Sequence, residues 1–120
     1  MTWAQLCRLA RELPEVVEGI WFRTPSLNVR DKSFVRLKED GKTVVFLVES
    51  VDEQELLIAA RPKVYFITDH YRGYPAVLAR LAALSPAEAR VRLARAWRQK
   101  APKRLVRALE GKETGRASRR

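Results

Sequence analysis

The sequence predicts one small α+β domain in which helices flank two groups of strands. Short β-rich runs between residues 26 and 48 are separated by polar turns, of which Asp40-Gly41 is the strongest hairpin signal. Runs with a helical period precede and follow them, and prolines end those runs. The chain has 120 residues, 47% of them hydrophobic, which is enough for one domain with one core.

The N-terminal helix is expected between Thr2, which suits an N-cap, and Pro14, because apolar residues recur there at helical spacing. Residues 14–22 then change to a β-leaning mixture broken by Gly19, from which we expect an irregular first strand or an approach to one. Thr24-Pro25 is an extended or turn element, since proline disfavours the α region for the residue before it. The meander strands are expected at residues 26–30, 33–37 and 43–48, with turns at 31–32 and 39–42.

A second helix is expected to begin at Ser50 or Asp52, where serine or aspartate suits an N-cap and acidic residues suit the positive helix end. It ends before Pro62. Its apolar face is assigned to Leu56, Leu57 and Ala60.

The stretch Asp69-His70-Tyr71-Arg72-Gly73-Tyr74-Pro75 is a shaped connection between a strand at 64–68 and the run 76–81, which suits either a short strand or a helix start. Its tyrosines have two interpretations. Either they bury their rings and fix a turn, or they stack on bases beside an arginine that binds phosphate. We favour the structural role for Tyr74 and leave Arg72 open.

A third helix begins at Ser85-Pro86, where serine caps and proline takes the first position. Its period places Leu93 and Trp97 on one side and a basic arc on the other. After a break at Ala101-Pro102, a short helix is expected at residues 103–109, followed by a basic disordered tail at 111–120.

The net charge of +10 lies in the last quarter of the chain. Residues 1–89 carry twelve basic and twelve acidic residues, whereas residues 90–120 carry twelve basic and two acidic ones. Such a block is typical of a solvated tail or of a surface for an anionic partner such as nucleic acid or membrane headgroups. On charge alone, solubility explains it at least as well as binding.

Enzymatic functions find little support. The one cysteine, Cys7, suits the core, and the one histidine, His70, has no second ligand at metal-site spacing. No P-loop, dinucleotide-binding glycine pattern or nucleophile elbow is present. We therefore predict no catalytic residue, no cofactor and no metal, and a structural role for His70. Without a signal-peptide pattern or a membrane-length apolar run, a cytoplasmic location is expected.

Several motifs together resemble the MmcQ/YjbR-like family of small bacterial proteins, which are described as double-wing DNA-binding domains. These motifs are Gly19, Thr24-Pro25, Asp40-Gly41, His70-Tyr71-Arg72-Gly73-Tyr74-Pro75, and Trp97 followed by Ala101-Pro102-Lys103-Arg104. The resemblance covers roughly residues 2–107 and implies a two-layer domain at 1–110, with an antiparallel sheet and helices mainly on one face, similar to secretion-chaperone-like and frataxin-like folds. It favours a strand at 76–81 and hence the order α-β(3)-α-β(2)-α.

The resemblance also implies a protein that binds DNA through hairpin wings. We expect it to be non-enzymatic, to associate with no membrane, and to be a monomer or weak homodimer. The candidate nucleic-acid-binding residues are the wing and loop residues Arg30, Lys32, Lys38, Lys42 and Arg72, and, from the basic C-terminal region, Arg92, Arg95, Arg98, Lys103, Arg104 and Arg107. The alternative is a protein–protein interaction module that uses the open sheet face and binds no nucleic acid. An open face lined with Arg30, Lys32, Arg36 and Lys38 would favour DNA, and an apolar face that pairs two chains would favour the alternative.

Overall fold

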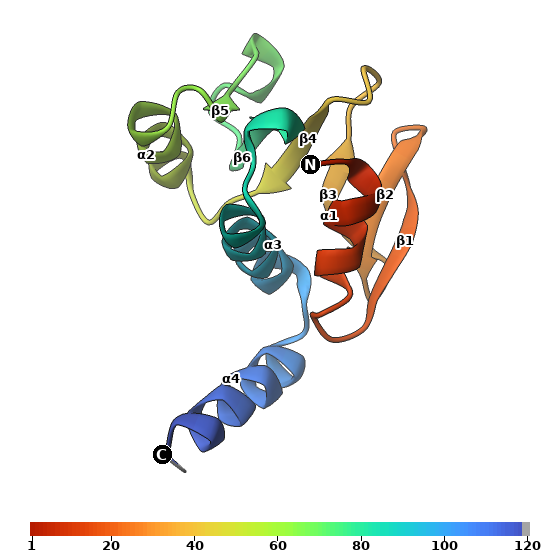
Figure 1. Ribbon diagram of the computed structural model, residues 1–120, viewed down its shortest axis with the longest axis vertical. Helices are drawn as coiled ribbons and strands as arrows, with labels where there is room; N and C mark the ends of the chain where they lie inside the picture. Colours follow the sequence, from red (N-terminus) through yellow and green to blue (C-terminus); the bar gives the residue numbers. More distant parts are fainter. Residues whose placement is uncertain (119–120) are drawn as a thin grey trace.

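A computed structural model describes the backbone of residues 1–118 and the side chains of residues 1–111. Within that range, four α-helices and six strands form an α+β fold, which confirms the predicted class (Figure 1). The helices are α1 (Trp3–Ala10), α2 (Val51–Ala60), α3 (Pro86–Lys100) and α4 (Lys103–Ser118). The strands are β1 (Val16–Trp21), β2 (Thr24–Val29), β3 (Lys32–Leu37), β4 (Thr43–Leu47), β5 (Tyr65–Phe66) and β6 (Ala76–Arg80).

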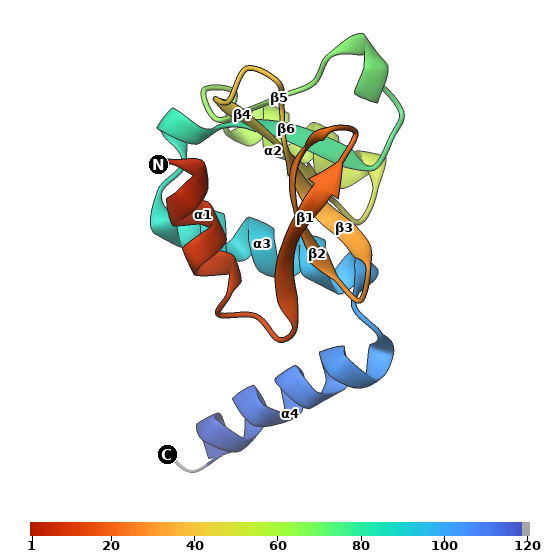
Figure 2. The same cartoon turned by 90° about the vertical axis from the view of Figure 1, so that its right-hand side faces the viewer.

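The strands form one antiparallel sheet in the order β1-β2-β3-β4-β6-β5. Helices α1 and α3 pack together over β1–β4, and α2 packs against β5 and β6 (Figures 1 and 2). Because successive hairpins reverse direction, the β2–β3 turn lies at one end of the sheet. The β1–β2 and β3–β4 turns lie at the other end.

The predicted core residue Trp97 is fully buried, as are Leu6, Phe34 and Leu93. Its indole N–H donates to the carbonyl of Pro14 at 3.0 Å, which ties α3 to the end of the α1 segment. A buried indole needs such a partner, so Trp97 contributes both apolar area and a fixed hydrogen bond to the core.

The sequence-predicted N-caps are confirmed. The Thr2 hydroxyl accepts from the Gln5 amide at 3.2 Å, and the Gln5 side chain accepts from the Thr2 amide at 2.8 Å, so the two form a capping box. The hydroxyls of Ser50 and Ser85 each accept from an amide three residues on, at 3.1 Å. These local signals fix where the helices begin.

Residues 16–21 form a regular strand that pairs with β2 along its whole length, so four strands precede α2 instead of the expected three. Gly19 does not break the strand. It lies beneath the Asn28 side chain, whose amide nitrogen would be 2.4 Å from any added Cβ. Glycine is used here for a close approach of side chain to backbone.

Two hairpins in series use two-residue turns whose central residues both have positive φ. These are Phe22 (53°) with Arg23 (67°), and Arg30 (49°) with Asp31 (66°). Positive φ at both positions is what a type I′ turn requires, and this turn matches the twist of antiparallel strands. The turn predicted at Asp31-Lys32 is therefore wrong by one residue, since its central residues are Arg30 and Asp31. Neither turn contains a glycine, which would have marked its position in the sequence.

The predicted apolar face of α2 is right for Leu57, which packs against the core, and wrong for its other two residues. Leu56 is 69% exposed and Ala60 is also exposed, whereas Gln54 is buried. The Gln54 side-chain amide donates to the carbonyls of Tyr71 (3.1 Å), Tyr74 (2.8 Å) and Ala76 (2.7 Å). Helix α2 is thus attached to the loop before β6 by a polar side chain.

Helix α4 is longer than the helix predicted at 103–109. Its backbone stays helical to Ser118, across most of the segment predicted as a disordered tail, and Arg119 and Arg120 lie outside the described residues. The added turns combine good helix formers such as Lys, Glu, Arg and Ala with Gly111 and Gly115, which are poor ones. In both views α4 extends away from the sheet (Figures 1 and 2).

Candidate functional site

A cleft of 420 Å³ lies on the sheet face that α1 and α3 leave uncovered, at the end with the β1–β2 and β3–β4 turns. Strands β3, β4 and β6 form its floor, and the loop at residues 69–75 forms one wall. The lining is mainly aromatic, with one arginine and one glutamate, and its principal side chains are Trp21, Phe22, Arg36, Glu39, Tyr71 and Tyr74.

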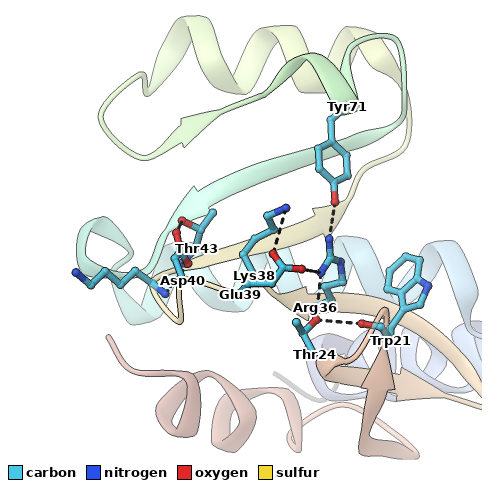
Figure 3. Close-up of polar contacts among 9 residues, drawn as sticks. Trp21, Thr24, Arg36, Lys38, Glu39, Asp40, Thr43 and Tyr71 are labelled. Atoms are coloured by element: carbon cyan, nitrogen blue, oxygen red, sulfur yellow. Dashed lines mark hydrogen bonds and ion pairs between the residues drawn. The ribbon is translucent and has the colours of Figure 1, made fainter.

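Arg36 is the central charged residue of the cleft and is only 6% exposed. Its guanidinium donates to the Thr24 hydroxyl at 3.1 Å, to the Tyr71 hydroxyl at 3.1 Å and to the Glu39 carboxylate at 3.4 Å (Figure 3). The guanidinium carbon also lies 5.4 Å from the centroid of the Phe22 ring. A buried cation needs such partners, because burial removes the water that would otherwise solvate it.

Glu39 stands at the rim, with its carboxylate 3.6 Å from the Lys38 ammonium (Figure 3). A backbone hydrogen bond, followed by the nearby positive charges of Lys38 and Arg36, holds the pKa of Glu39 below its usual range. The carboxylate is therefore ionised at neutral pH and acts as a hydrogen-bond acceptor.

The exposed aromatic wall is formed at the tip of the β1–β2 hairpin. Phe22 is 69% exposed and stacks on Trp21, with 5.3 Å between ring centroids and 27° between ring planes. Positive φ is unfavourable for a bulky side chain, so Phe22 is held in a strained conformation. Such strain persists only where the surrounding structure enforces it.

The buried position favoured for Tyr74 is wrong, and Tyr71, for which both interpretations were open, takes it instead. Tyr71 is buried and hydrogen-bonded to Arg36, whereas Tyr74 is 49% exposed at the cleft. Gly73, at φ 76°, makes the turn between them. His70 packs edge-on against Tyr71, with ring centroids 5.0 Å apart.

The predicted wing cations do not form one surface. Arg30 and Lys32 lie at the β2–β3 end of the sheet, and Lys38 and Lys42 lie at the opposite end beside the cleft. Arg30 is ion-paired with Glu15, and the loop residue Arg72 with Asp69 at 2.9 Å. Lys32 and Lys42 are exposed and have no ion-pair partner among residues 1–111.

The exposed arginine arc predicted on α3 is wrong for Arg92 and right for Arg95 and Arg98, whose side chains are exposed but ion-paired. Arg92 is 8% exposed and lies between Glu53 (3.5 Å) and Glu88 (3.8 Å). Arg95 pairs with Glu53 and, at 3.4 Å, with Glu49 of the segment before α2. Arg98 pairs with Glu110 at 2.8 Å. The acidic residues at the start of α2 face these arginines of α3 and neutralise their charges. The helical period of α3 alone predicts that the same arginines point into solvent.

A second set of cations remains exposed and has no ion-pair partner within the described side chains. We name it the basic end, and it consists of Lys32, Lys100, Lys103, Arg104 and Arg107. Lys32 and Lys100 line one depression between the β2–β3 hairpin and the end of α3. Lys100, which ends α3 just before α4 begins, thus adjoins one wing residue. The side chains of residues 112–120 are outside the described set.

A model of the YjbR family matches residues 11–99, which is most of the chain. This chain belongs to the YjbR family. Two curated relatives, an uncharacterized protein of Mycobacterium tuberculosis and one of Mycobacterium bovis, are each 50% identical to it over 52 residues. That segment is 43% of this chain and 40% of each relative, so this YjbR-family chain spans less than half the length of the relatives it matches.

The described residues of this YjbR-family chain contain no group of three or more His, Cys, Asp or Glu side chains placed to hold a metal ion. Among its described helices, none is long and apolar enough to cross a membrane. Burial, with a smaller effect of the Glu18 charge, raises the pKa of the Cys7 thiol to about 12, which keeps the thiol protonated.

Sequence reasoning missed Trp21, Phe22 and Glu39 as cleft residues of this family member. The Phe22-Arg23 turn carries no glycine, asparagine or proline, so no local signal marks it as a hairpin tip. Burial of Arg36 was also hidden, because a residue that alternates with Val35 and Leu37 is normally assigned to the solvent side of a strand.

Proposed function

We propose that this YjbR-family chain binds DNA without catalysing a reaction, and that the basic end contacts the phosphate backbone. The supporting observation is the distribution of ion pairs. Most of the described carboxylates are paired with arginine or lysine; the exceptions lie mainly in turns and in the first turn of α2. The cations of the basic end, in contrast, are exposed and have no ion-pair partner among the described side chains. Unpaired cations gain most from phosphate, because no carboxylate competes for them.

The proposal predicts a particular salt dependence. Each duplex phosphate that a cation neutralises releases counterions, so the logarithm of affinity falls with the logarithm of salt concentration by roughly 0.9 per contact. Such contacts carry no base information, so unrelated duplex sequences should bind about equally at this surface.

Fluorescence anisotropy with a labelled duplex at several salt concentrations tests this. The test variant replaces three cations of α4 with alanine: Lys103, Arg104 and Arg107. The control removes the same charge from three ion-paired arginines, Arg11, Arg30 and Arg90, whose exposed pairs contribute little to stability. We expect the slope to flatten by roughly two to three in the test variant and by less than one in the control. Equal slopes in the two variants would contradict the proposal.

A second candidate is the protein-interaction module. It is favoured by the exposed apolar side chains of the edge strand β1 and its tip, namely Val17, Ile20 and Phe22. The open face itself is mixed, since the buried Arg36 lies within an otherwise mainly apolar cleft. A concentration-dependent dimer in sedimentation velocity that Ile20→Ser abolishes, together with DNA binding no stronger than that of an unrelated protein of equal charge, would favour this candidate.

A further inference from the structure

The cleft presents a hydrogen-bond donor and an acceptor side by side. Contacts with Thr24, Glu39 and Tyr71 occupy three of the five N–H groups of the Arg36 guanidinium, which leaves donors for a ligand. The Glu39 carboxylate, 3.4 Å away, is 66% exposed and accepts only. A ligand edge that fits both groups needs an acceptor next to one or more donors.

The walls of the cleft suit a flat ring. Phe22 and Tyr74 expose large parts of their rings at its mouth, and aromatic side chains in this position stack on planar heterocycles. The volume of 420 Å³ lies within the range of small-ligand sites, about 300–1,000 Å³. An aliphatic or strongly charged ligand would gain little from these walls.

We propose that the cleft holds one unpaired guanine base of a nucleic-acid strand, with Arg36 donating to O6 and Glu39 accepting from N1–H and N2–H. This inference rests on the proposed nucleic-acid binding and names the part of the ligand that this cleft takes. The Watson–Crick edge of guanine presents that acceptor beside two donors, whereas thymine presents an acceptor beside a single donor and adenine offers the reverse order. The edge is free only when the base is unpaired, which is the usual condition for recognition by stacking and by this edge.

One strand can reach both the cleft and the basic end. The depression lined by Lys32 and Lys100 shares Trp21, Leu47 and Tyr74 with the cleft lining, so the two hollows adjoin each other. A strand of twelve nucleotides spans about 40 Å at a stacked rise of 3.4 Å. Phosphate contacts at one end and base contacts at the other are therefore compatible.

The test uses labelled twelve-nucleotide oligothymidylates that carry dG, dA, dC or deoxyinosine at one central position, with fluorescence anisotropy at fixed low salt. We expect the dG strand to bind on the order of tenfold more tightly than the unsubstituted strand, with inosine intermediate because it lacks N2–H. Glu39→Gln removes a negative charge and should therefore raise the affinity for every strand slightly, but it should bring the affinities for the dG strand and for oligothymidylate to the same value. Phe22→Ala should weaken all strands, whereas the matched Val17→Ala, an exposed residue of β1 outside the cleft lining, should not.

The outcomes separate this inference from the function on which it rests. Salt-dependent binding of all oligonucleotides without a preference for dG, or equal effects of Phe22→Ala and Val17→Ala, would overturn the cleft assignment and leave DNA binding standing. Absence of binding to both duplex and single strand would overturn both. A competition arm with free dGMP identifies the source of the base: displacement at concentrations equal to those of the strand would assign the cleft to a free nucleotide instead.

Discussion

Gln54 shows how one polar residue shapes the cleft. It is 1% exposed, and its amide bonds three main-chain carbonyls in the segment 71–76, which carries Tyr71 and Tyr74. These bonds add to the main-chain hydrogen bonds of the loop and to the bond between Arg36 and the Tyr71 hydroxyl, so this side chain helps to fix the position of the loop.

We expect Gln54→Ala to lower the free energy of unfolding by about 1–3 kcal/mol, because it removes the hydrogen bonds of a buried side chain. Urea unfolding measures this change, and the exposed Gln99→Ala on α3 is the control, for which no significant change is expected. Hydrogen exchange at the amides of residues 71–76 should also accelerate in the first variant only. Equal stabilities of the two variants would contradict this role.

The sequence could not reveal Gln54 for a physical reason. A helix with Leu56, Leu57 and Ala60 normally buries those residues, and a glutamine is normally solvated. Here the surface opposite α2 is main chain, and its carbonyls accept hydrogen bonds from a buried donor. That surface forms from residues some 20 positions later, so no pattern within the helix encodes it. Phe22 was missed for a related reason, since its strained turn lacks the residues that mark turns.

At the scale of elements, α2 and α3 are joined by the pairs that Glu53 makes with Arg92 and Arg95. Burial opposes ionisation of Glu53, but the hydrogen bond and charge of Arg95, with the charge of Arg92, outweigh it and lower the pKa of Glu53. A carboxyl whose folded pKa is depressed contributes stability above its ordinary pKa of 4.5, and this contribution is lost as pH falls through the folded value.

We therefore expect the free energy of unfolding to fall below about pH 4.5, with part of that fall absent in Glu53→Gln, which is also less stable at pH 7. Denaturant unfolding between pH 7 and pH 3 measures this. Glu55→Gln, at an exposed acid of the same helix, should keep the wild-type profile. If both variants keep it, Glu53 does not couple the helices.

For the helices, the sequence could predict where they begin but not all of the side chains that are buried. Helix starts at Thr2, Ser50 and Ser85 were predictable because a cap lies within three residues of its partner. The burial of Arg92 was not, because it depends on Glu53 arriving from another helix. Periodicity predicts which face of a helix a side chain lies on. Whether that face is exposed to solvent or covered depends on the neighbouring element.

For the whole molecule, ion pairs balance the charge over most of the domain and leave the excess at the C-terminal region. Cutting after Glu110 removes four basic residues and one acidic residue, while every described core residue is retained. We expect such a protein to bind all duplex sequences more weakly and with a flatter salt slope, because the lost contacts are to phosphates. Anisotropy measures the slope, and an unchanged melting temperature is the control for folding. An unchanged slope would exclude these residues from the DNA contact.

At the strained turn Phe22-Arg23, selection for hairpin stability and selection for the cleft favour different residues. Asparagine followed by glycine would relax both positive φ angles and give a more stable hairpin. The same exchange would delete the aromatic ring at the mouth of the cleft. Selection for thermal stability alone would favour Asn-Gly at these two positions. Retention of the aromatic residue among family members would therefore indicate selection for binding in the cleft.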